Sequence, residues 1–436
     1  MADSVQINPC GPVDGAIRPP GSKSITNRAI ICAALADGDS RLTGVLDSED
    51  TQVMIGAWKQ LGLQVQHDTT NAELLVSGCG GVIPNPRAEI FVANSGTTVR
   101  FLTAALAACE GDFVLDGVAR MRERPIRDLL DALRQLGANV ESTNPNMPDC
   151  PPVHIRAKKL LGGRANISGA ISSQYLSGLM MASPLASTSV EIQVDGELVS
   201  VPYVSMTAAV MEAFGASVSG MPPEPITVDS RARYSGTDYA IEPDASAASY
   251  FWGAAAITGG QATVQGLNTD SLQGDVGFCK VLEKMGCRVI WRPDSVTVSG
   301  TKNLHGVDVN MADISDTVQT LAAVALVAEG NTRVTGVAHN RVKETDRIAD
   351  LARELRKLGA EVSEFEDGLE IQPPKSIQFA EIETYNDHRM AMSLSLAGLV
   401  SDHGVRILNP NCTAKTYPSY WQDLESFSGC RVDRRN

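Results

Sequence analysis

The sequence predicts an α/β protein built from six copies of one unit with the order strand, helix, strand, helix, strand, strand. Two patterns that recur along the chain indicate this class. In the first, an amphipathic helix ends in glycine and leads into a short strand. In the second, an alanine- and leucine-rich helix ends in glycine before a strand. Such regular recurrence is typical of architectures in which similar units pack on one another.

The first pattern marks the second helix of each unit. Its glycine stands where a helix ends in the left-handed conformation, and the residues after it alternate as in a strand. Successive glycines lie 70 to 78 residues apart, so six units account for nearly the whole chain. The six segments cover residues 58–65, 133–140, 211–218, 282–289, 355–362 and 426–432.

The second pattern marks the first helix of a unit. Its end is found at residues 33–38, 107–111, 325–330 and 399–404. Alanine faces allow helices to approach closely, so these helices are expected to pack on those of neighbouring units. This expectation concerns packing and carries no information about function.

The composition indicates a protein with a large core and no affinity for nucleic acid. With 436 residues, of which 43% are hydrophobic, about two or three domains are expected. The net charge of −14 argues against nucleic acid as a partner. No apolar run reaches the length of a membrane span, and residues 1–10 lack the features of a signal peptide. The sequence therefore predicts a cytoplasmic protein without a membrane partner.

The cysteines and histidines predict neither a disulfide framework nor a metal site. Nine cysteines, none in a C-x-x-C pair, favour reduced thiols. The six histidines are dispersed and none belongs to an H-E-x-x-H motif.

The stretch Arg341-Val-Lys-Glu-Thr-Asp-Arg347 is the most informative part of the chain. We expect a helix to begin here, with Lys343 and Arg347 four residues apart on one face. A helix N-terminus attracts anions, so the two cations there favour a site for a phosphate or a carboxylate, with Glu344 beside it to move a proton. The alternative is a charged first turn that faces solvent.

Other polar and charged residues also fall at expected helix starts. Serine, threonine, asparagine and aspartate belong there as caps, which is a sufficient explanation for any one of them. Capping does not explain cations, which are disfavoured at that end of a helix, so they favour an anion-binding site. The starts carry Ser22 to Ser24 with Arg28, Asn94 to Thr97, Arg124, Ser172 to Gln174, Ser200 to Tyr203, Asp316, Lys343 to Arg347, Asp387 to Arg389 and Lys415.

Six motifs in this set resemble those of one family, the 5-enolpyruvylshikimate-3-phosphate (EPSP) synthases. The resemblance spans residues 21–418 with the motifs in the family's order. They are Gly21-Ser-Lys-Ser-Ile-Thr-Asn-Arg28, Asn94-Ser-Gly-Thr-Thr-Val-Arg100, Arg122-Glu-Arg-Pro125, Arg341-Val-Lys-Glu-Thr-Asp-Arg347, Tyr385-Asn-Asp-His-Arg-Met390 and Thr413-Ala-Lys-Thr416.

The resemblance implies a monomer with two domains, each an inside-out α/β barrel of three units. The first domain would be discontinuous and comprise residues 1–20 and 242–436, and the second would comprise residues 21–241. The implied reaction moves the enolpyruvyl group of phosphoenolpyruvate to the 5-hydroxyl of shikimate 3-phosphate and releases phosphate, through a tetrahedral intermediate. No metal and no organic cofactor is implied.

The resemblance also implies roles for individual residues. Asp316 would take the proton of the 5-hydroxyl, while Glu344 would deliver a proton to the methylene carbon and later remove one, assisted by Lys23. Phosphoenolpyruvate would be bound by Lys23, Gly96, Arg124, Gln174, Arg347, Arg389 and Lys415. Shikimate 3-phosphate would be bound by Lys23, Ser24, Arg28, Ser172, Ser173, Gln174, Ser200, Tyr203, Asp316, His339 and Lys343.

Two departures from the family pattern bear on the acceptor side. Ser315 stands where the family usually has proline, and the segment offers both Asp313 and Asp316. Asp316 is preferred because its distance of 27 residues from Lys343 matches the family and because it would cap a helix. His339 replaces an asparagine that contacts substrate in many members, so it either donates a hydrogen bond in its place or the contact is lost.

A third departure concerns inhibitors. Phe101 follows Arg100 where proline is frequent in the family. Gly96 favours sensitivity to mimics of phosphoenolpyruvate such as glyphosate, whereas Phe101 leaves that sensitivity open.

Three other interpretations are weaker. The sister family that uses UDP-N-acetylglucosamine as acceptor has a cysteine in the loop that corresponds to residues 118–124, and this chain has none there. A P-loop needs glycine directly before its lysine, whereas Ser22 precedes Lys23. A scaffold that only binds anions would not need Glu344 or Asp316.

Overall fold

The computed structural model describes residues 3–169, 172–196 and 198–435. The chain divides into two compact units. One consists of Met1–Pro20 together with Glu242–Asn436 and is called the discontinuous unit, and the other consists of Gly21–Ile241 and is called the continuous unit. No helix in the described ranges has both the length and the apolar character needed to cross a membrane.

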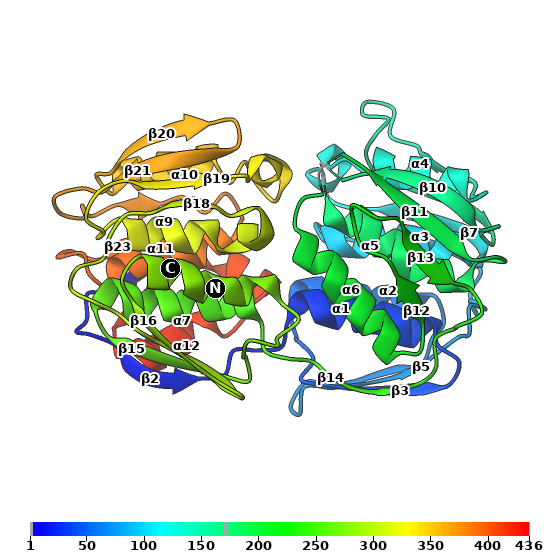
Figure 1. Ribbon diagram of the computed structural model, residues 1–436, viewed down its shortest axis with the longest axis horizontal. Helices are drawn as coiled ribbons and strands as arrows, with labels where there is room; N and C mark the ends of the chain where they lie inside the picture. Colours follow the sequence, from blue (N-terminus) through cyan, green and yellow to red (C-terminus); the bar gives the residue numbers. More distant parts are fainter. Residues whose placement is uncertain (1–2, 170–171, 197, 436) are drawn as a thin grey trace. The chain divides into compact units, whose positions relative to one another are not determined.

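The described residues form six four-stranded sheets, three in each unit, which confirms the predicted α/β class (Figure 1). Every sheet has one parallel pair, formed by an edge strand and its neighbour, and its other neighbouring strands are antiparallel. Four of the six sheets and their helices reproduce the predicted order of strand, helix, strand, helix, strand, strand along the chain, although β2 (Asp14–Ile17) is separated from the rest of its repeat by the continuous unit. In the other two sheets one strand comes from elsewhere in the chain, because β14 (Asp238–Ala240) follows the other elements of its repeat and β1 (Ser4–Ile7) precedes them. The repeat read from the glycine spacing is therefore a structural repeat.

The sheets of the continuous unit are built from strands 3 to 14. The first has the order β14 (Asp238–Ala240), β3 (Asp39–Thr43), β5 (Glu73–Ser77) and β4 (Val65–Asp68). The second has the order β6 (Arg87–Phe91), β7 (Glu110–Asp116), β9 (Val153–Lys158) and β8 (Val140–Ser142). The third has the order β10 (Gly163–Ser168), β11 (Val190–Asp195), β13 (Ile226–Asp229) and β12 (Ser217–Ser219).

The sheets of the discontinuous unit include the first two strands of the chain. One has the order β2 (Asp14–Ile17), β15 (Gln261–Gln265), β17 (Ser295–Ser299) and β16 (Arg288–Arg292). The next has the order β18 (Asp308–Asn310), β19 (Thr332–Thr335), β21 (Gly368–Gln372) and β20 (Glu361–Phe365). The last has the order β22 (Glu381–Ile382), β23 (Val405–Leu408), β1 (Ser4–Ile7) and β24 (Val432–Arg435).

The first helix of every repeat lies in the middle of its unit and the sheets lie outside. In the discontinuous unit α7 (Ala245–Thr258), α9 (Val318–Ala325) and α11 (His388–Gly398) contact one another and are buried almost throughout (Figure 1). Their small residues permit the close approach, since a Cβ on Gly253 of α7 would lie 2.9 Å from Thr320 Cγ2. In the continuous unit α1 (Lys23–Leu35), α3 (Gly96–Ala107) and α5 (Ser173–Ala182) contact one another in the same way.

The second helices leave one face exposed and end as predicted. They are α2 (Glu49–Gln60), α4 (Arg127–Gln135), α6 (Val201–Ala213), α8 (Phe278–Lys284), α10 (Ala349–Lys357) and α12 (Tyr420–Ser428). The glycine that follows each of them, or caps it, has a φ between +66° and +102°. These values lie in the left-handed region that only glycine adopts without strain, which confirms the end signal.

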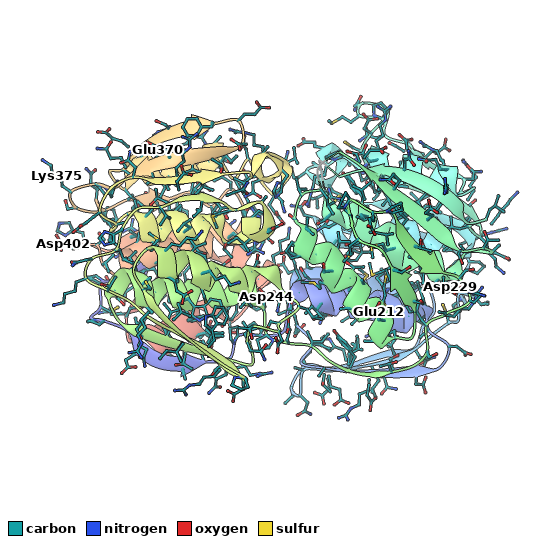
Figure 2. The ribbon with its side chains drawn as sticks, in the orientation of Figure 1. Glu212, Asp229, Asp244, Glu370, Lys375 and Asp402 are labelled. Carbon is teal, nitrogen blue, oxygen red and sulfur yellow. The ribbon has the colours of Figure 1, made fainter. Side chains whose placement is uncertain are left out.

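Four of the first helices, α1, α3, α5 and α11, begin where the sequence predicts. Ser22, Ser95 and Ser172 cap α1, α3 and α5, and each side chain accepts a backbone N–H of the first turn. Asp387 caps α11 by accepting from the backbone of Arg389. Asp244, which the sequence did not single out, caps α7, and Figure 2 labels it at the start of that helix.

The predicted helix start at Arg341 to Arg347 is wrong. Residues 338–342 form the 3₁₀ turn η5 (Ala338–Val342), and α10 begins only at Ala349. The reason is local, because Asp346 Oδ1 accepts from the backbone N–H groups of Ile348 and Ala349 at 3.1 and 3.0 Å and so fixes the start of the helix. Lys343 and Arg347 therefore do not share a helical face.

Three further starts differ in the same way. Arg124 follows the 3₁₀ turn η1 (Met121–Glu123) and lies before α4, and Lys415 ends the turn η6 (Pro410–Lys415) well before α12. Asp316 lies in η4 (Ala312–Thr317) and does not cap α9, because its carboxylate is engaged by cations instead. The cations of the second helices thus stand on turns that precede them.

Candidate functional site

Arg347 is the centre of a charged cluster in the discontinuous unit. Its guanidinium is 2% exposed and contacts three carboxylates at once. Nη1 lies 3.1 Å from Asp316 Oδ1, Nη2 lies 2.9 Å from Glu344 Oε2, and Nε lies 2.7 Å from Asp387 Oδ2. A planar guanidinium suits such a set because its five N–H donors have fixed directions. Arg347 thus fixes the positions of three acidic groups from different turns.

Three more cations complete this cluster. Lys343 Nζ lies 3.6 Å from Asp316 Oδ1, and Arg389 Nη2 lies 2.7 Å from Asp316 Oδ2. Lys415 Nζ lies 3.0 Å from Glu344 Oε1. The Arg347 cluster is defined by Asp316, Lys343, Glu344, Arg347, Asp387, Arg389 and Lys415.

The Arg347 cluster has four cationic and three carboxylate side chains, so one positive charge is in excess. Although burial works to lower it, the carboxylates of Asp387, Glu344 and Asp316 raise the pKa of Arg347 above its ordinary value. Burial lowers the pKa of Lys343, and the neighbouring Arg347 adds to that effect. Repulsion among the cations makes an additional anion favourable at this place.

His339 forms part of the same surroundings as a neutral side chain. Burial, with Lys343 nearby, lowers the pKa of His339 to about 4. Its Nε2 hydrogen-bonds to Ser315 Oγ at 2.9 Å, and its buried Nδ1 has no hydrogen-bond partner in the described part of the protein. The two residues at which this chain departs from the family pattern on the acceptor side therefore contact each other.

Asp275 is a buried carboxyl close to this cluster that the sequence did not single out. It lies in the turn η3 (Gly274–Gly277), which packs on the turn that carries Asp316. One oxygen hydrogen-bonds to the hydroxyl of Ser246, and the other has no hydrogen-bond partner among the described residues. Burial, followed by the charge of Asp316, raises the pKa of Asp275 from its ordinary value of 3.8 to about 7.

Asp275→Asn is expected to remove a pH dependence of stability. The folded protein binds this proton more tightly than the unfolded chain does, so the stability is fully present below pH 4 and is lost as the pH rises through 7. Between pH 5 and pH 8 the free energy of unfolding of the wild type should fall by about 2 to 3 kcal/mol relative to that of the variant. Urea unfolding at both pH values measures this difference.

Asp270→Asn serves as the control for Asp275→Asn because Asp270 is an exposed aspartate of the preceding loop. Its difference from the wild type should be the same at both pH values. A constant difference for Asp275→Asn as well would mean that this carboxyl titrates near its ordinary value.

The continuous unit brings a second group of predicted residues together around Arg28. The guanidinium is 1% exposed, and burial lowers its pKa to about 10. Nε donates to Thr207 Oγ1 at 2.7 Å, and Nη1 donates to the carbonyl of Ser24 at 2.9 Å. Nη2 donates to Ser177 Oγ and to the carbonyl of Tyr203 at 3.1 and 3.4 Å. Arg28 thus joins the starts of α1 and α6 through α5.

No carboxylate lies within ion-pair distance of Arg28 in the described ranges. Its charge is stabilised by neutral oxygens and by the rings of Phe101 and Tyr203, whose centroids lie 5.2 and 5.7 Å from Cζ. Lys23, one turn earlier in α1, lies 3.6 Å from the buried carboxylate of Asp50. The start of α1 therefore combines a buried, unneutralised cation with a paired one.

Gln174 and Ser172 are positioned by Arg100, which the sequence did not identify as a site residue. Arg100 Nη1 donates to Gln174 Oε1 at 2.6 Å and to Ser172 Oγ at 3.5 Å. Gln174 Nε2 donates in turn to Thr97 Oγ1 at 3.3 Å, which joins the starts of α3 and α5. The signal in the sequence was its spacing, since Arg100 stands one helical turn after Gly96.

Arg124 lies against the start of α3. Its Nη1 donates to the carbonyl of Asn94 at 3.1 Å and lies 3.4 Å from Asn94 Oδ1. A Cβ on Gly96 would lie 2.4 Å from Arg124 Nη2, so only glycine leaves room for this guanidinium.

The remaining predicted residues lie at the starts of α5 and α6. Ser173 is the first residue of α5 and is buried, and Ser200 caps α6 with a left-handed backbone. Tyr203 lies in the first turn of α6 beside Arg28. Where the structure describes the chain, no three His, Cys, Asp or Glu side chains are arranged to hold a metal ion.

Comparison with known families covers almost the whole chain. The family model described as EPSP synthase (3-phosphoshikimate 1-carboxyvinyltransferase) matches residues 7–424. The chain is 47% identical over 444 residues to the chloroplastic 3-phosphoshikimate 1-carboxyvinyltransferase of Brassica napus, with 98% of this chain and 86% of that protein covered. It is 46% identical over 428 residues to the 3-phosphoshikimate 1-carboxyvinyltransferase of Colwellia psychrerythraea, with 98% of this chain and 100% of that protein covered.

A solved structure shows the same fold. The EPSP synthase of Acinetobacter baumannii superposes with a TM-score of 0.83 at 27% sequence identity, covering 99% of this chain and 100% of that chain.

Proposed function

Because the chain belongs to the EPSP synthase (3-phosphoshikimate 1-carboxyvinyltransferase) family, we propose that it transfers the enolpyruvyl group of phosphoenolpyruvate to the 5-hydroxyl of shikimate 3-phosphate. The observation that carries this proposal is the environment of Glu344. This carboxyl is 9% exposed and lies between Lys415 at 3.0 Å and Arg347 at 2.9 Å, beside an excess of positive charge. It is a proton-transfer group placed where an anionic substrate is favoured.

The charges of the substrates explain the need for so many cations. Phosphoenolpyruvate has a carboxylate and a phosphate, and the acceptor has another of each, so binding both substrates concentrates negative charge. The residues that would bind phosphoenolpyruvate are Lys23, Gly96, Arg124, Gln174, Arg347, Arg389 and Lys415. Each charge-assisted hydrogen bond contributes about 1.5 to 3 kcal/mol.

The acceptor would use mainly the continuous unit. Ser24, Arg28, Ser172, Ser173, Gln174, Ser200 and Tyr203 would bind shikimate 3-phosphate there, with Lys23. Arg28 supports this role because its buried charge has no carboxylate partner in the described residues. Asp316, His339 and Lys343 would also bind shikimate 3-phosphate, with His339 acting as a neutral hydrogen-bonding group.

The reaction would proceed by addition and elimination. Glu344 would protonate the methylene carbon of phosphoenolpyruvate, which makes the neighbouring carbon electrophilic. The 5-hydroxyl oxygen would add to that carbon while Asp316 takes its proton, and the surrounding cations would stabilise the tetrahedral adduct. Glu344, assisted by Lys23, would then remove a proton from the new methyl group as the C–O bond to phosphate breaks, and the phosphate would leave with the proton that Asp316 had taken. These reaction steps need no metal and no organic cofactor.

The experiment that tests the proposal is phosphate release with two acceptors. Phosphoenolpyruvate with shikimate 3-phosphate should give steady turnover, whereas phosphoenolpyruvate with UDP-N-acetylglucosamine should give none. If phosphoenolpyruvate released phosphate only with UDP-N-acetylglucosamine and not with shikimate 3-phosphate, UDP-N-acetylglucosamine would be the acceptor.

Gly96→Ala is expected to weaken the binding of phosphoenolpyruvate. The added methyl group would overlap the Arg124 guanidinium, which must then leave its contacts with Asn94. A displacement of this size should raise the KM for phosphoenolpyruvate by about 10- to 100-fold. Steady-state kinetics with saturating shikimate 3-phosphate measures it.

Gly56→Ala is the matched control for Gly96→Ala. Gly56 also lies in a helix of the continuous unit, and a Cβ there meets nothing within 4 Å. Its KM should equal that of the wild type. Equal values for both variants would mean that Arg124 does not bind phosphoenolpyruvate.

Two further properties, the cytoplasmic location and the monomeric state, stay predictions from the sequence. Sensitivity to glyphosate, which Gly96 favours and Phe101 leaves open, is not decided by the sequence.

A further inference from the structure

Side chains of α10 connect two segments that carry residues of the Arg347 cluster. The first segment is the loop 343–347, which contains Lys343, Glu344 and Arg347. The second, called the turn 384–389, runs from the turn at Tyr385 into the first residues of α11 and contains Asp387 and Arg389. The two segments contact each other directly through Arg347 and Asp387. They are also joined through α10 by contacts that the proposed reaction does not use.

The turn 384–389 has an unfavourable backbone. Tyr385 and Asn386 have φ values of 52° and 55°, and these two residues come just before Asp387, which caps α11 and pairs with Arg347. Two successive side-chain-bearing residues in the left-handed region persist only where surrounding contacts hold them. The contact available to Asn386 is a hydrogen bond from Asn409 Nδ2 to its Oδ1 at 3.3 Å.

Tyr385 is held more firmly, by α10. Its hydroxyl donates to Glu354 Oε1 at 2.6 Å and accepts from Arg353 Nη1 at 3.0 Å, and its ring lies 5.6 Å from Arg353 Cζ. Glu354 is fully buried and also accepts from Lys357 Nζ at 2.7 Å and from the backbone of Glu383 at 3.0 Å. The anchor for Tyr385 is therefore itself fixed.

Arg353 extends this connection to the loop 343–347. The same Nη1 donates to Asp350 Oδ1 at 2.6 Å, and the other oxygen of Asp350 accepts from the hydroxyl of Thr345. A continuous chain of hydrogen bonds thus runs from Thr345 through Asp350 and Arg353 to Tyr385. Thr345 directly follows Glu344, and Tyr385 stands two residues before Asp387.

We propose that Asp350, Arg353 and Tyr385 are positioning residues that hold the loop 343–347 and the turn 384–389 in register. They touch no reacting atom in this scheme and act through Glu344, Arg347 and Arg389. The inference rests on the proposed function, because it assigns those three side chains to phosphoenolpyruvate. Loss of the connection would remove none of the cations but would let the two segments that carry them shift against each other.

Tyr385→Phe and Arg353→Gln test the inference, with Arg356→Gln as the matched control. Arg356 lies on the same helix, is similarly exposed and also contacts one carboxylate, Glu364 at 2.9 Å, but it is bonded to β20 rather than to either segment. Tyr385→Phe removes a single oxygen and keeps the ring.

Both test variants should raise the KM for phosphoenolpyruvate and lower kcat, each by about tenfold, because small shifts of positioned groups have effects of this order. The KM for shikimate 3-phosphate should change less than threefold, since most of its proposed ligands belong to the continuous unit. A purely structural role would instead lower the folded fraction and leave both KM values unchanged. Arg356→Gln should equal the wild type.

The double variant gives the sharpest readout. If Tyr385 and Arg353 act as one connection, the combined change should be no larger than the greater single effect. Multiplying effects, or the same losses in Arg356→Gln, would overturn the inference. A wild type that does not release phosphate would contradict the proposed function instead, so the two failures are distinguishable.

Discussion

Glu344→Gln is expected to lower kcat by about 10³-fold while leaving the fold intact, because general acid–base catalysis contributes about 10² to 10⁴ in rate. The glutamine side chain keeps the size of glutamate and can still accept a hydrogen bond from Lys415 or Arg347. It cannot give a proton to the methylene carbon or take one from the methyl group. The loss should therefore appear mainly in kcat, with the KM for phosphoenolpyruvate changed only a few-fold.

Initial rates of phosphate release, with circular dichroism of the same samples, measure this prediction. Glu361→Gln is the control, because Glu361 is an exposed glutamate of β20 in the same unit. It should have the kcat of the wild type. A Glu344→Gln enzyme with nearly normal kcat would remove Glu344 from the proton transfers.

Arg347→Met is expected to destabilise the protein by about 3 to 5 kcal/mol and to abolish turnover, because it removes one partner of a buried ion-pair network. The carboxylates of Asp316, Glu344 and Asp387 are 15%, 9% and 0% exposed, and all three contact this one guanidinium. Methionine fills a similar volume but neutralises none of them. Asp387 would lose both of its hydrogen bonds to Arg347 at once.

Chemical denaturation measures the stability effect. Arg41→Met is the matched control, because Arg41 also forms a two-point pair with a carboxylate, that of Glu73 at 2.9 and 2.7 Å, but on an exposed sheet surface. Its removal should leave the free energy of unfolding almost unchanged. Equal losses in both variants would mean that burial of the Arg347 cluster has no bearing on stability.

The features of the fold that the sequence predicted correctly are local. Each helix-ending glycine needs only its own positive φ, and Ser22, Ser95, Ser172 and Asp387 cap helices with their own side chains. The start of α10 was predicted too early because Asp346, which lies inside the charged motif 341–347, accepts the first backbone N–H groups of the helix. Capping rules place a helix start correctly only when every residue that could cap it is compared.

The site was predictable in its cations and not in their partners. Arg347, Arg389 and Lys415 stood out because cations are unusual near helix starts. Arg347 contacts Asp316 and Asp387, Arg100 contacts Gln174, and His339 contacts Ser315. The two residues of each of these pairs are separated by 24 to 74 positions in the sequence, and only the pair of Arg347 with Glu344 is local. Pairings over such separations depend on the packing of repeats, which periodicity alone does not specify. Asp275 lay outside every motif for the same reason.

The place of β1 and β2 has a consequence for the order in which the chain folds during synthesis. The continuous unit contains every strand of its three sheets once residue 240 has been made, since β14 pairs with β3. β2 must wait for β15 at residues 261–265, and β1 pairs with β23 and β24, so Ser4 meets Leu408 and Arg435. The continuous unit can therefore fold while β1 and β2 still lack the strands with which they pair. The sheet of β22, β23, β1 and β24 can be completed only at the end of translation.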